Sequence, residues 1–256
     1  RFAKGVNAGV DQFGGVADSA ILLAAYKAGK VSLAQIDKSV RRILMIKVEL
    51  GLFENPYVDE AAALKIVGDP AAQAEAEQAQ RHAQVLLENE GGLLPVATGR
   101  KVWLYKVDPA EAKARGFIVV DDPAQADLAI LRVDAPFETL HPYHFFGSRQ
   151  NEGRLDFRDG QADYEAIKRA SAKVPTAVAI NLDRPAILTN VRDKVQVLLA
   201  TFGASDAAVL DVLTGKARAQ GKLPFELPSS MSAVEQQDPA VPDDSASPLY
   251  PRGAGL

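Results

Sequence analysis

The chain has 256 residues, of which 47% are hydrophobic and 24% charged, enough to bury the core of one large domain or two small ones. Its formal net charge of −4 argues against a nucleic-acid-binding protein, and the absence of cysteine excludes disulfides, thiol catalysis and cysteine-ligated zinc. No apolar run approaches the ~18 residues of a membrane-spanning helix. From the charge we expect no nucleic acid as partner, and from the short apolar runs we expect no membrane.

The first part of the chain reads as one short strand followed by helices. The apolar stretch 8–13 predicts a buried strand, and 21–28 predicts a helix. Ser32 with Gln35 forms a capping-box signature in front of a second, longer helix. A strand followed by helices is what the last unit of a (β/α)8 barrel would look like, although these residues alone are too few to close one.

A linker and a helix over 70–89 follow, and from residue 101 onwards strand and helix patterns alternate. The runs expected as strands are 102–107, 117–120, 128–133, 176–182 and 195–202, and those expected as helices are 109–115, 162–173 and 206–214. Apolar strands with helices between them predict an α/β fold with a mostly parallel sheet covered on both faces. Pro185 makes 183–190 an irregular crossover, 221–228 reads as a further strand, and 229–256 reads as an extended tail.

The longest stretch without a regular pattern, 134–160, is the best candidate for a functional loop, because it follows the end of a predicted strand. It is rich in aromatic residues: Phe137, Tyr143, Phe145, Phe146 and Phe157. Aromatic rings beside carboxylates and arginine suit sugar binding, since sugar C–H faces stack on rings while hydroxyls need polar partners. The alternative is a loop whose aromatic side chains only pin it to the surface.

Within this loop, the run from Asn151 to Asp156 is the most distinctive element, and a glutamate on a loop, here Glu152, is physically suited to be a proton donor. Glycoside hydrolysis needs one carboxyl group that protonates the leaving oxygen and another that attacks or activates water. Glu138 and Asp134 are the alternative candidates for the proton donor. The simplest alternative is that Glu152 is a solvated glutamate without a catalytic role.

His141 and His144 offer two imidazoles three positions apart. Pro142 argues against a helix there and no third ligand is apparent, so we expect no metal and no cofactor. The candidate substrate-binding residues, which would contact sugar hydroxyls and ring faces, are His141, Tyr143, His144, Phe146 and Arg149.

Several segments, in the same order along the chain, resemble glycoside hydrolase family 3. They are NAGVDQF (7–13), DKSVRRILMIKVELGLFENP (37–56), VLLENEGGLLP (85–95), PTAVAINLDRP (175–185), and the run from Gly203 to Pro228 that ends in GKLPFELP. In addition, Glu152-Gly153 with Asp156 resembles the Glu-Gly-x-Asp element that carries the acid/base residue in β-glucosidases of this family, with the aspartate one position later.

The resemblance implies that residues 1–60 are the C-terminal remnant of a (β/α)8 barrel, 61–100 a linker and entry helix, 101–228 a six-stranded αβα sandwich and 229–256 a tail. It also implies retaining hydrolysis of terminal, non-reducing β-D-glucosyl residues, from a β-glucoside or a short β-gluco-oligosaccharide. Glu152 would then be the acid/base, while the nucleophilic aspartate would lie in an N-terminal barrel part that precedes this sequence. Asp11 reads as a structural residue, or at most as one that supports a residue of the site. A periplasmic or secreted location is favoured over a cytoplasmic one.

Two alternatives remain open at this point. The chain would be a non-catalytic carbohydrate-binding or scaffolding module if Glu152 were not needed for turnover, because a doubly wound sheet supports binding as readily as catalysis. It would also fit a β-xylosidase of the same family.

Overall fold

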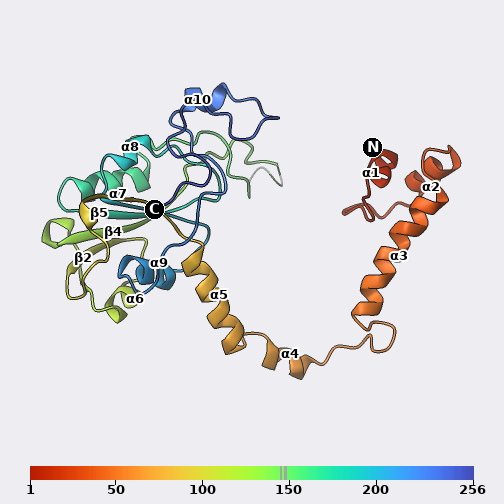
Figure 1. The fold of residues 1–256 in the computed structure, drawn as a ribbon, viewed down its shortest axis with the longest axis horizontal. Helices are drawn as coiled ribbons and strands as arrows, with labels where there is room; N and C mark the ends of the chain where they lie inside the picture. The colour runs from red at the N-terminus through yellow and green to blue at the C-terminus, as the bar shows by residue number, and fades with distance from the viewer. Residues whose placement is uncertain (145, 147–148) are drawn as a thin grey trace. The chain divides into compact units, whose positions relative to one another are not determined.

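The computed structural model describes residues 1–144, 146 and 149–256, and it divides into two compact units, Arg1–Asp69 and Pro70–Leu256 (Figure 1). Each unit is described by itself. In the described part of the chain, no helix combines the length and the apolar character needed to cross a bilayer.

The first unit is helical. Its elements are α1 (Phe2–Asn7), α2 (Ala20–Lys27), α3 (Leu33–Glu49) and α4 (Glu60–Ile66). The capping box at the start of α3 is confirmed, because the Ser32 hydroxyl accepts a hydrogen bond from the Gln35 N–H over 3.2 Å. Asp11, expected to be structural, pairs with Arg42 on α3 at 3.3 Å.

The predicted strand at 8–13 is wrong: these residues, all described, form turns and irregular backbone. An isolated strand is not stable, because its backbone N–H and C=O groups need a neighbouring strand. The elements of this unit are helices and offer no such edge.

The second unit is built on a six-stranded sheet with the order β1-β6-β5-β4-β2-β3. The strands are β1 (Val85–Asn89), β2 (Lys101–Tyr105), β3 (Ile118–Val120), β4 (Leu128–Asp134), β5 (Thr176–Asn181) and β6 (Val197–Thr201). All neighbouring pairs are parallel except β1 with β6, which is antiparallel. The prediction of a six-stranded, mostly parallel sheet is therefore confirmed.

Helices cover both faces of this sheet, as Figure 1 shows. Alternate residues of β4 enter two separate cores: Leu131 packs in the cluster that includes Ile167 of α7, and Ile130 in the cluster that includes Leu210 of α9. This alternation is why β4 reads as a continuous apolar run. The remaining helices of the unit are α5 (Pro70–His82), α6 (Pro109–Ala114), α7 (Ala162–Ser171), α8 (Thr189–Arg192), α9 (Asp206–Leu213) and α10 (Met231–Glu235), with 3-10 turns at Glu90–Gly92 and Pro123–Gln125.

The predicted helix over 70–89 is wrong in its second half. Helix α5 ends at His82, and Val85–Asn89 is strand β1, paired with β6. Val85 and Leu87 are buried on one side of β1, an alternation of period two that is hard to separate from a helix end in so short an apolar run.

The predicted strand at 221–228 is also wrong. Of these residues, all of which are described, only Leu227 takes part in a β-bridge, with Tyr250 of the tail. The tail itself includes the short helix α10 and ends against β1, where the Leu256 N–H donates to the Leu86 carbonyl over 2.8 Å.

Candidate active site

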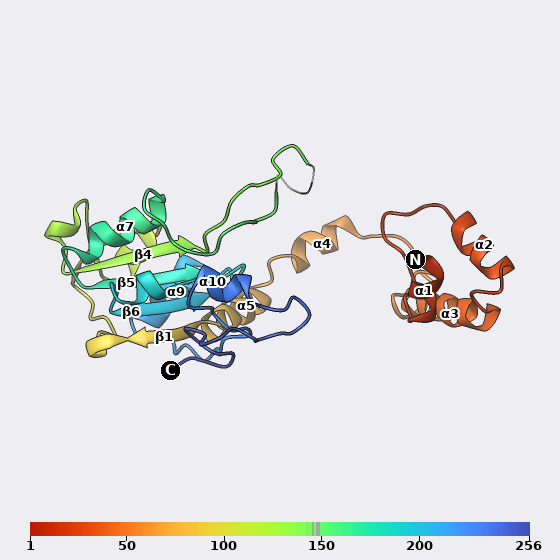
Figure 2. The ribbon, with the colours of Figure 1, turned by 90° about the horizontal axis from the view of Figure 1, so that it is seen from above.

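Between β4 and α7, residues 134–144 and 149–160 form the two sides of a hairpin-like arm, which we call the arm. Glu138 and Glu152 form an antiparallel bridge across it, with each backbone N–H donating to the other residue's carbonyl over 3.1 and 2.8 Å. The arm starts at Asp134, the C-terminal end of β4, and extends beyond that edge of the sheet (Figure 2). In parallel α/β sheets, functional groups gather at this edge.

Gly153 allows the two sides of the arm to approach. Its φ is +69°, and a Cβ at this position would stand 2.2 Å from Oε2 of Glu138 and 2.7 Å from its Cβ. Only glycine adopts that backbone without strain and leaves this space free. The Glu-Gly pair recognised in the sequence is therefore a geometric requirement of the arm.

Glu152 presents its carboxylate to His141, across the arm. Both carboxylate oxygens lie within hydrogen-bond distance of Nδ1 of His141, at 3.0 and 2.9 Å. A carboxylate can only accept hydrogen bonds, so Nδ1 of His141 carries a hydrogen and is the donor. This hydrogen bond holds the pKa of Glu152 below its usual value, against the opposing effect of desolvation. The side chain is 22% exposed, so it is held in place but reachable.

Glu138, the first alternative proton donor, is engaged within the arm. Its Oε2 accepts the Arg154 N–H over 3.0 Å, and its Oε1 accepts from the Arg158 guanidinium over 2.8 Å. The hydrogen bond from the Arg154 N–H and, to a smaller extent, the one from Arg158 hold the pKa of Glu138 below its usual value. A carboxylate satisfied in this way is better suited to bracing the arm than to donating a proton.

Asp134, the second alternative, lies at the base of the arm. One of its oxygens is 3.4 Å from Nζ of Lys106, which also pairs with Asp163 at 2.8 Å. This cluster links the ends of β2 and β4 to the start of α7, at the point where the arm begins.

The aromatic residues of the arm divide into two groups. Tyr143 is 99% exposed and Phe146 is 72% exposed, whereas Phe157 is 3% exposed and packs against Tyr164 in the core. Exposed aromatic rings, the kind that suits sugar binding, are therefore present at Phe137, Tyr143 and Phe146, whereas Phe157 belongs to the core. Phe145 lies outside the described residues.

The two histidines are close together, but they do not form a metal centre with other residues. Their rings meet edge to face, with centroids 5.6 Å apart. Nowhere in the described part of the chain do three histidine, cysteine, aspartate or glutamate side chains gather as a metal site requires. Arg149 follows in the same turn region, where its N–H donates to the Phe146 carbonyl over 3.0 Å.

Two residues next to Glu152 were missed as candidates. Asp183 accepts a hydrogen bond from the Asn151 amide, and the Arg184 guanidinium donates to the carbonyls of Glu152 and Gly153 over 2.5 and 2.8 Å. The available signal was the position of Asp183-Arg184 directly after the predicted strand at 176–182, at the same sheet edge as the arm.

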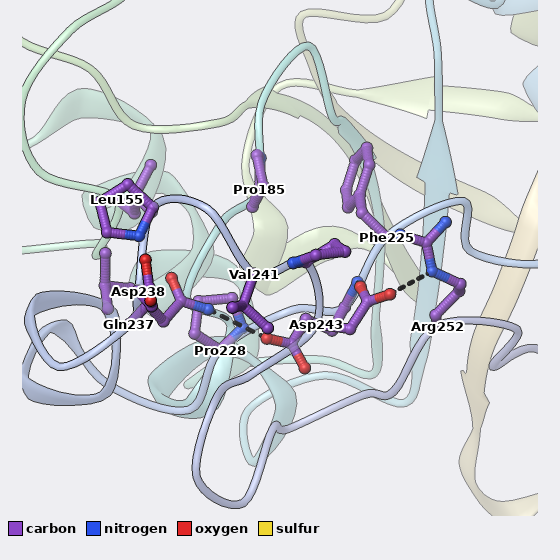
Figure 3. Close-up of a pocket in the computed structure, with 13 residues that line it drawn as sticks. Leu155, Pro185, Phe225, Pro228, Gln237, Asp238, Val241, Asp243 and Arg252 are labelled. Carbon is purple, nitrogen blue, oxygen red and sulfur yellow. Dashed lines mark hydrogen bonds and ion pairs between the residues drawn. The ribbon is translucent and has the colours of Figure 1, made fainter.

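A cavity of about 460 Å³ lies beside this region, between the crossover at Pro185 and the tail (Figure 3). Leu155, three positions after Glu152, lines one wall. Asp243 and Arg252 in the opposite wall pair with each other. Because these charges are paired within the wall, the arm is the better candidate for the reacting groups.

The family model described as the glycosyl hydrolase family 3 C-terminal domain matches residues 113–256. The chain belongs to glycosyl hydrolase family 3. Across its full length it is 53% identical to the "Periplasmic beta-glucosidase/beta-xylosidase" of Dickeya chrysanthemi and 38% identical to "Beta-glucosidase C" of Emericella nidulans.

The family 3 chain spans about two fifths of the curated relatives it matches, 39% of the Dickeya protein and 41% of the Emericella protein. Among solved structures, the β-glucosidase of Listeria innocua in complex with glucose matches 98% of this chain and 42% of its own, with a TM-score of 0.70 and 19% identity. The β-glucosidase EmGH1 of Erythrobacter marinus matches 98% of this chain and 44% of its own, with a TM-score of 0.72 and 20% identity. These likenesses confirm the α/β fold.

Proposed function

We propose that this chain supplies the acid/base carboxyl group, Glu152, of a retaining, exo-acting β-glycosidase of the β-glucosidase type. The substrate would be a β-glucoside or short β-gluco-oligosaccharide, cleaved at its terminal non-reducing β-D-glucosyl residue. The observation that carries the proposal is a partly exposed carboxylate, oriented by His141, on an arm at the C-terminal edge of the sheet. Membership of family 3 supports it.

In this reaction Glu152 has two roles. As an acid it gives its proton to the glycosidic oxygen while the nucleophile attacks the anomeric carbon, so that the aglycone leaves as an alcohol. As a base it then takes a proton from the water that attacks the glycosyl-enzyme, which restores the carboxyl group and releases the sugar with retained configuration.

The acid role requires that Glu152 be protonated when substrate binds, whereas the hydrogen bond from His141 lowers its pKa. A second carboxylate about 5 Å away, the separation typical of retaining enzymes, would raise the pKa by like-charge repulsion. That repulsion disappears when the nucleophile becomes glycosylated, and the low pKa then suits the base role.

The nucleophile and the rest of the sugar site would come from an N-terminal barrel part, to which residues 1–60 would belong. The first unit exposes large apolar side chains along α3, among them Val40, Leu44, Met45 and Val48. An exposed apolar face of this kind is typical of a surface that packs against other protein.

We propose that His141, His144, Tyr143, Phe146 and Arg149 contact the substrate, through hydrogen bonds to hydroxyls and by stacking. The Dickeya relative's name includes both β-glucosidase and β-xylosidase, so a β-xylosidase is kept as an alternative within the same mechanism. The same name, with that of a Salmonella typhimurium relative, supports a periplasmic or secreted location.

The test is Glu152→Ala in the complete enzyme, assayed on aryl β-glucosides with good and poor leaving groups. Loss of a general acid slows poor leaving groups most, and added azide should restore turnover with release of a β-glycosyl azide. Glu75→Ala, on the exposed face of α5, is the matched control and should behave as wild type.

A non-catalytic carbohydrate-binding or scaffolding module is the second candidate, favoured by the exposed Tyr143 and Phe146. In that case Glu152→Ala changes affinity for sugar but not the dependence on the leaving group. Turnover close to wild type would contradict the proposed role of Glu152.

A further inference from the structure

The segment that carries Glu152 lies beside the crossover that follows β5. The contacts run in register: Asn151 with Asp183, Glu152 and Gly153 with Arg184, and Asp156 with Ile187 in a parallel bridge. The Ile187 N–H also donates to the Leu155 carbonyl over 3.0 Å. The arm is therefore joined to the crossover along its second half.

The crossover is the rigid partner in this pair. The Leu182 N–H donates to the Thr201 carbonyl over 2.8 Å, which joins the end of β5 to β6. Beyond Arg184, Pro185 restricts the backbone, and Ala186 and Leu188 are completely buried. Arg184 thus projects from a segment held by the core of the sheet.

Arg184 completes the hydrogen bonding of the Glu152 backbone. The Glu152 carbonyl accepts from the Glu138 N–H over 2.8 Å and from Arg184 over 2.5 Å, and the Glu152 N–H donates to Glu138. A carbonyl oxygen has two lone pairs, and both are used here. Glu138 belongs to the arm itself. Of the two hydrogen bonds to the Glu152 carbonyl, the one from Arg184 therefore joins it to the crossover.

We propose that Arg184 is a positioning residue that fixes where the Glu152 carboxyl group stands relative to the glycosidic oxygen. This inference rests on the proposed function. The guanidinium suits this role because its planar group donates to two adjacent carbonyls at once, those of Glu152 and Gly153. Two hydrogen bonds fix both the position and the orientation of the peptide between these residues. Lysine, with a single ammonium group on a flexible stem, cannot fix two acceptors in the same way.

The experiment compares Arg184→Ala, Arg184→Lys and Glu152→Ala in the complete enzyme, on aryl β-glucosides of differing leaving group. We expect Arg184→Ala to lower kcat by about 10- to 100-fold on poor leaving groups, since a misplacement of ~1 Å costs about 100-fold. Activated substrates should be slowed much less, and KM should change little. Arg184→Lys should recover part of the loss, and added guanidinium ion should restore Arg184→Ala in a saturable manner.

Arg192→Ala is the matched control, because Arg192 lies in the same crossover region and pairs with Asp193 at 3.2 Å. Its kcat should stay close to the wild-type value on substrates with good and with poor leaving groups. The melting temperature of each variant separates misfolding from mispositioning.

The outcomes separate this inference from the proposed function. If Glu152→Ala shows the leaving-group dependence and folded Arg184→Ala does not, the positioning role is overturned while the function stands. If neither variant shows it, the proposed function fails and the positioning role fails with it. A uniform loss on all substrates, with no rescue by guanidinium, would also contradict positioning.

Discussion

Nδ1 of His141 donates to both carboxylate oxygens of Glu152, at 3.0 and 2.9 Å, across the two sides of the arm. The contact orients the carboxyl group and lowers its pKa. His141 therefore has a role besides the contact with a sugar hydroxyl that we propose for it.

Replacement of His141 by alanine should shift the basic limb of the kcat/KM profile to higher pH. The hydrogen bond from His141 favours the charged form of Glu152 and lowers its pKa, so its removal raises that pKa and keeps the general acid protonated to higher pH. The measurement is the pH dependence of kcat/KM on an aryl β-glucoside. His82→Ala, on α5, is the control, and a basic limb that stays in place or moves to lower pH would contradict the assignment.

Gly153→Ala should destabilise the arm and reduce activity. The new Cβ would meet Oε2 of Glu138 at 2.2 Å, and the backbone φ of +69° is itself unfavourable for alanine, at a cost of about 1–3 kcal/mol. Gly160→Ala is a matched control, because its φ is +85° but its Cβ would meet nothing within 4 Å. The loss of kcat/KM should be greater in Gly153→Ala than in Gly160→Ala, and the absence of any difference between the two variants would contradict the close packing.

Asp211→Ala should lower the free energy of unfolding by about 1–3 kcal/mol, because it removes a buried hydrogen-bond acceptor from two guanidinium groups, which keep their pairs with Glu77 and Glu111. The Asp211 side chain is completely buried in α9 and accepts from Nε of Arg81 and Nε of Arg115, both over 2.8 Å. Denaturant unfolding of the protein measures the change. Asp193→Ala, an exposed change, should cost less than about 1 kcal/mol.

The same aspartate should make stability depend on acid. Burial by itself raises the pKa of Asp211, but the hydrogen bonds from Arg81 and Arg115 outweigh it and leave the pKa below its usual value. A carboxyl group with a lowered pKa stabilises the fold above its unfolded-state pKa and loses that contribution as the pH falls through the folded-state pKa. Unfolding measured from neutral to acidic pH should show a smaller acid-dependent loss in Asp211→Asn than in wild type, and equal losses would contradict the assignment.

Tyr250→Phe should loosen the C-terminal tail. The Tyr250 hydroxyl donates to Oε1 of Glu88 over 2.6 Å, and the ring is buried in the sheet core. Removal of the hydroxyl leaves a half-buried carboxylate without this donor, at a cost of about 1–3 kcal/mol. Limited proteolysis should cut the tail faster in this variant than in Tyr57→Phe, which changes an 84% exposed ring.

The amino-acid sequence was sufficient for the elements whose pattern is local. The strand at β4 and the helix at α9 agree with the predicted ranges within one or two residues, because the pattern of apolar residues in each segment identifies it without reference to the rest of the chain. The candidate proton donor, Glu152, rests instead on the resemblance of Glu152-Gly153 and Asp156 to the Glu-Gly-x-Asp element of the family.

Only the tertiary structure decided the features that depend on partners distant in sequence. Residues 85–89 became a strand because β6 offers an antiparallel edge, and 8–13 did not because their unit offers none. The residues that contact Glu152, His141 and Arg184, lie 11 and 32 positions away from it in the sequence. Neither has a periodic signal, because both arise only when the arm folds back and lies against the crossover. The sequence therefore determined the candidate residue, Glu152, and the fold determined which side chains hold it in place.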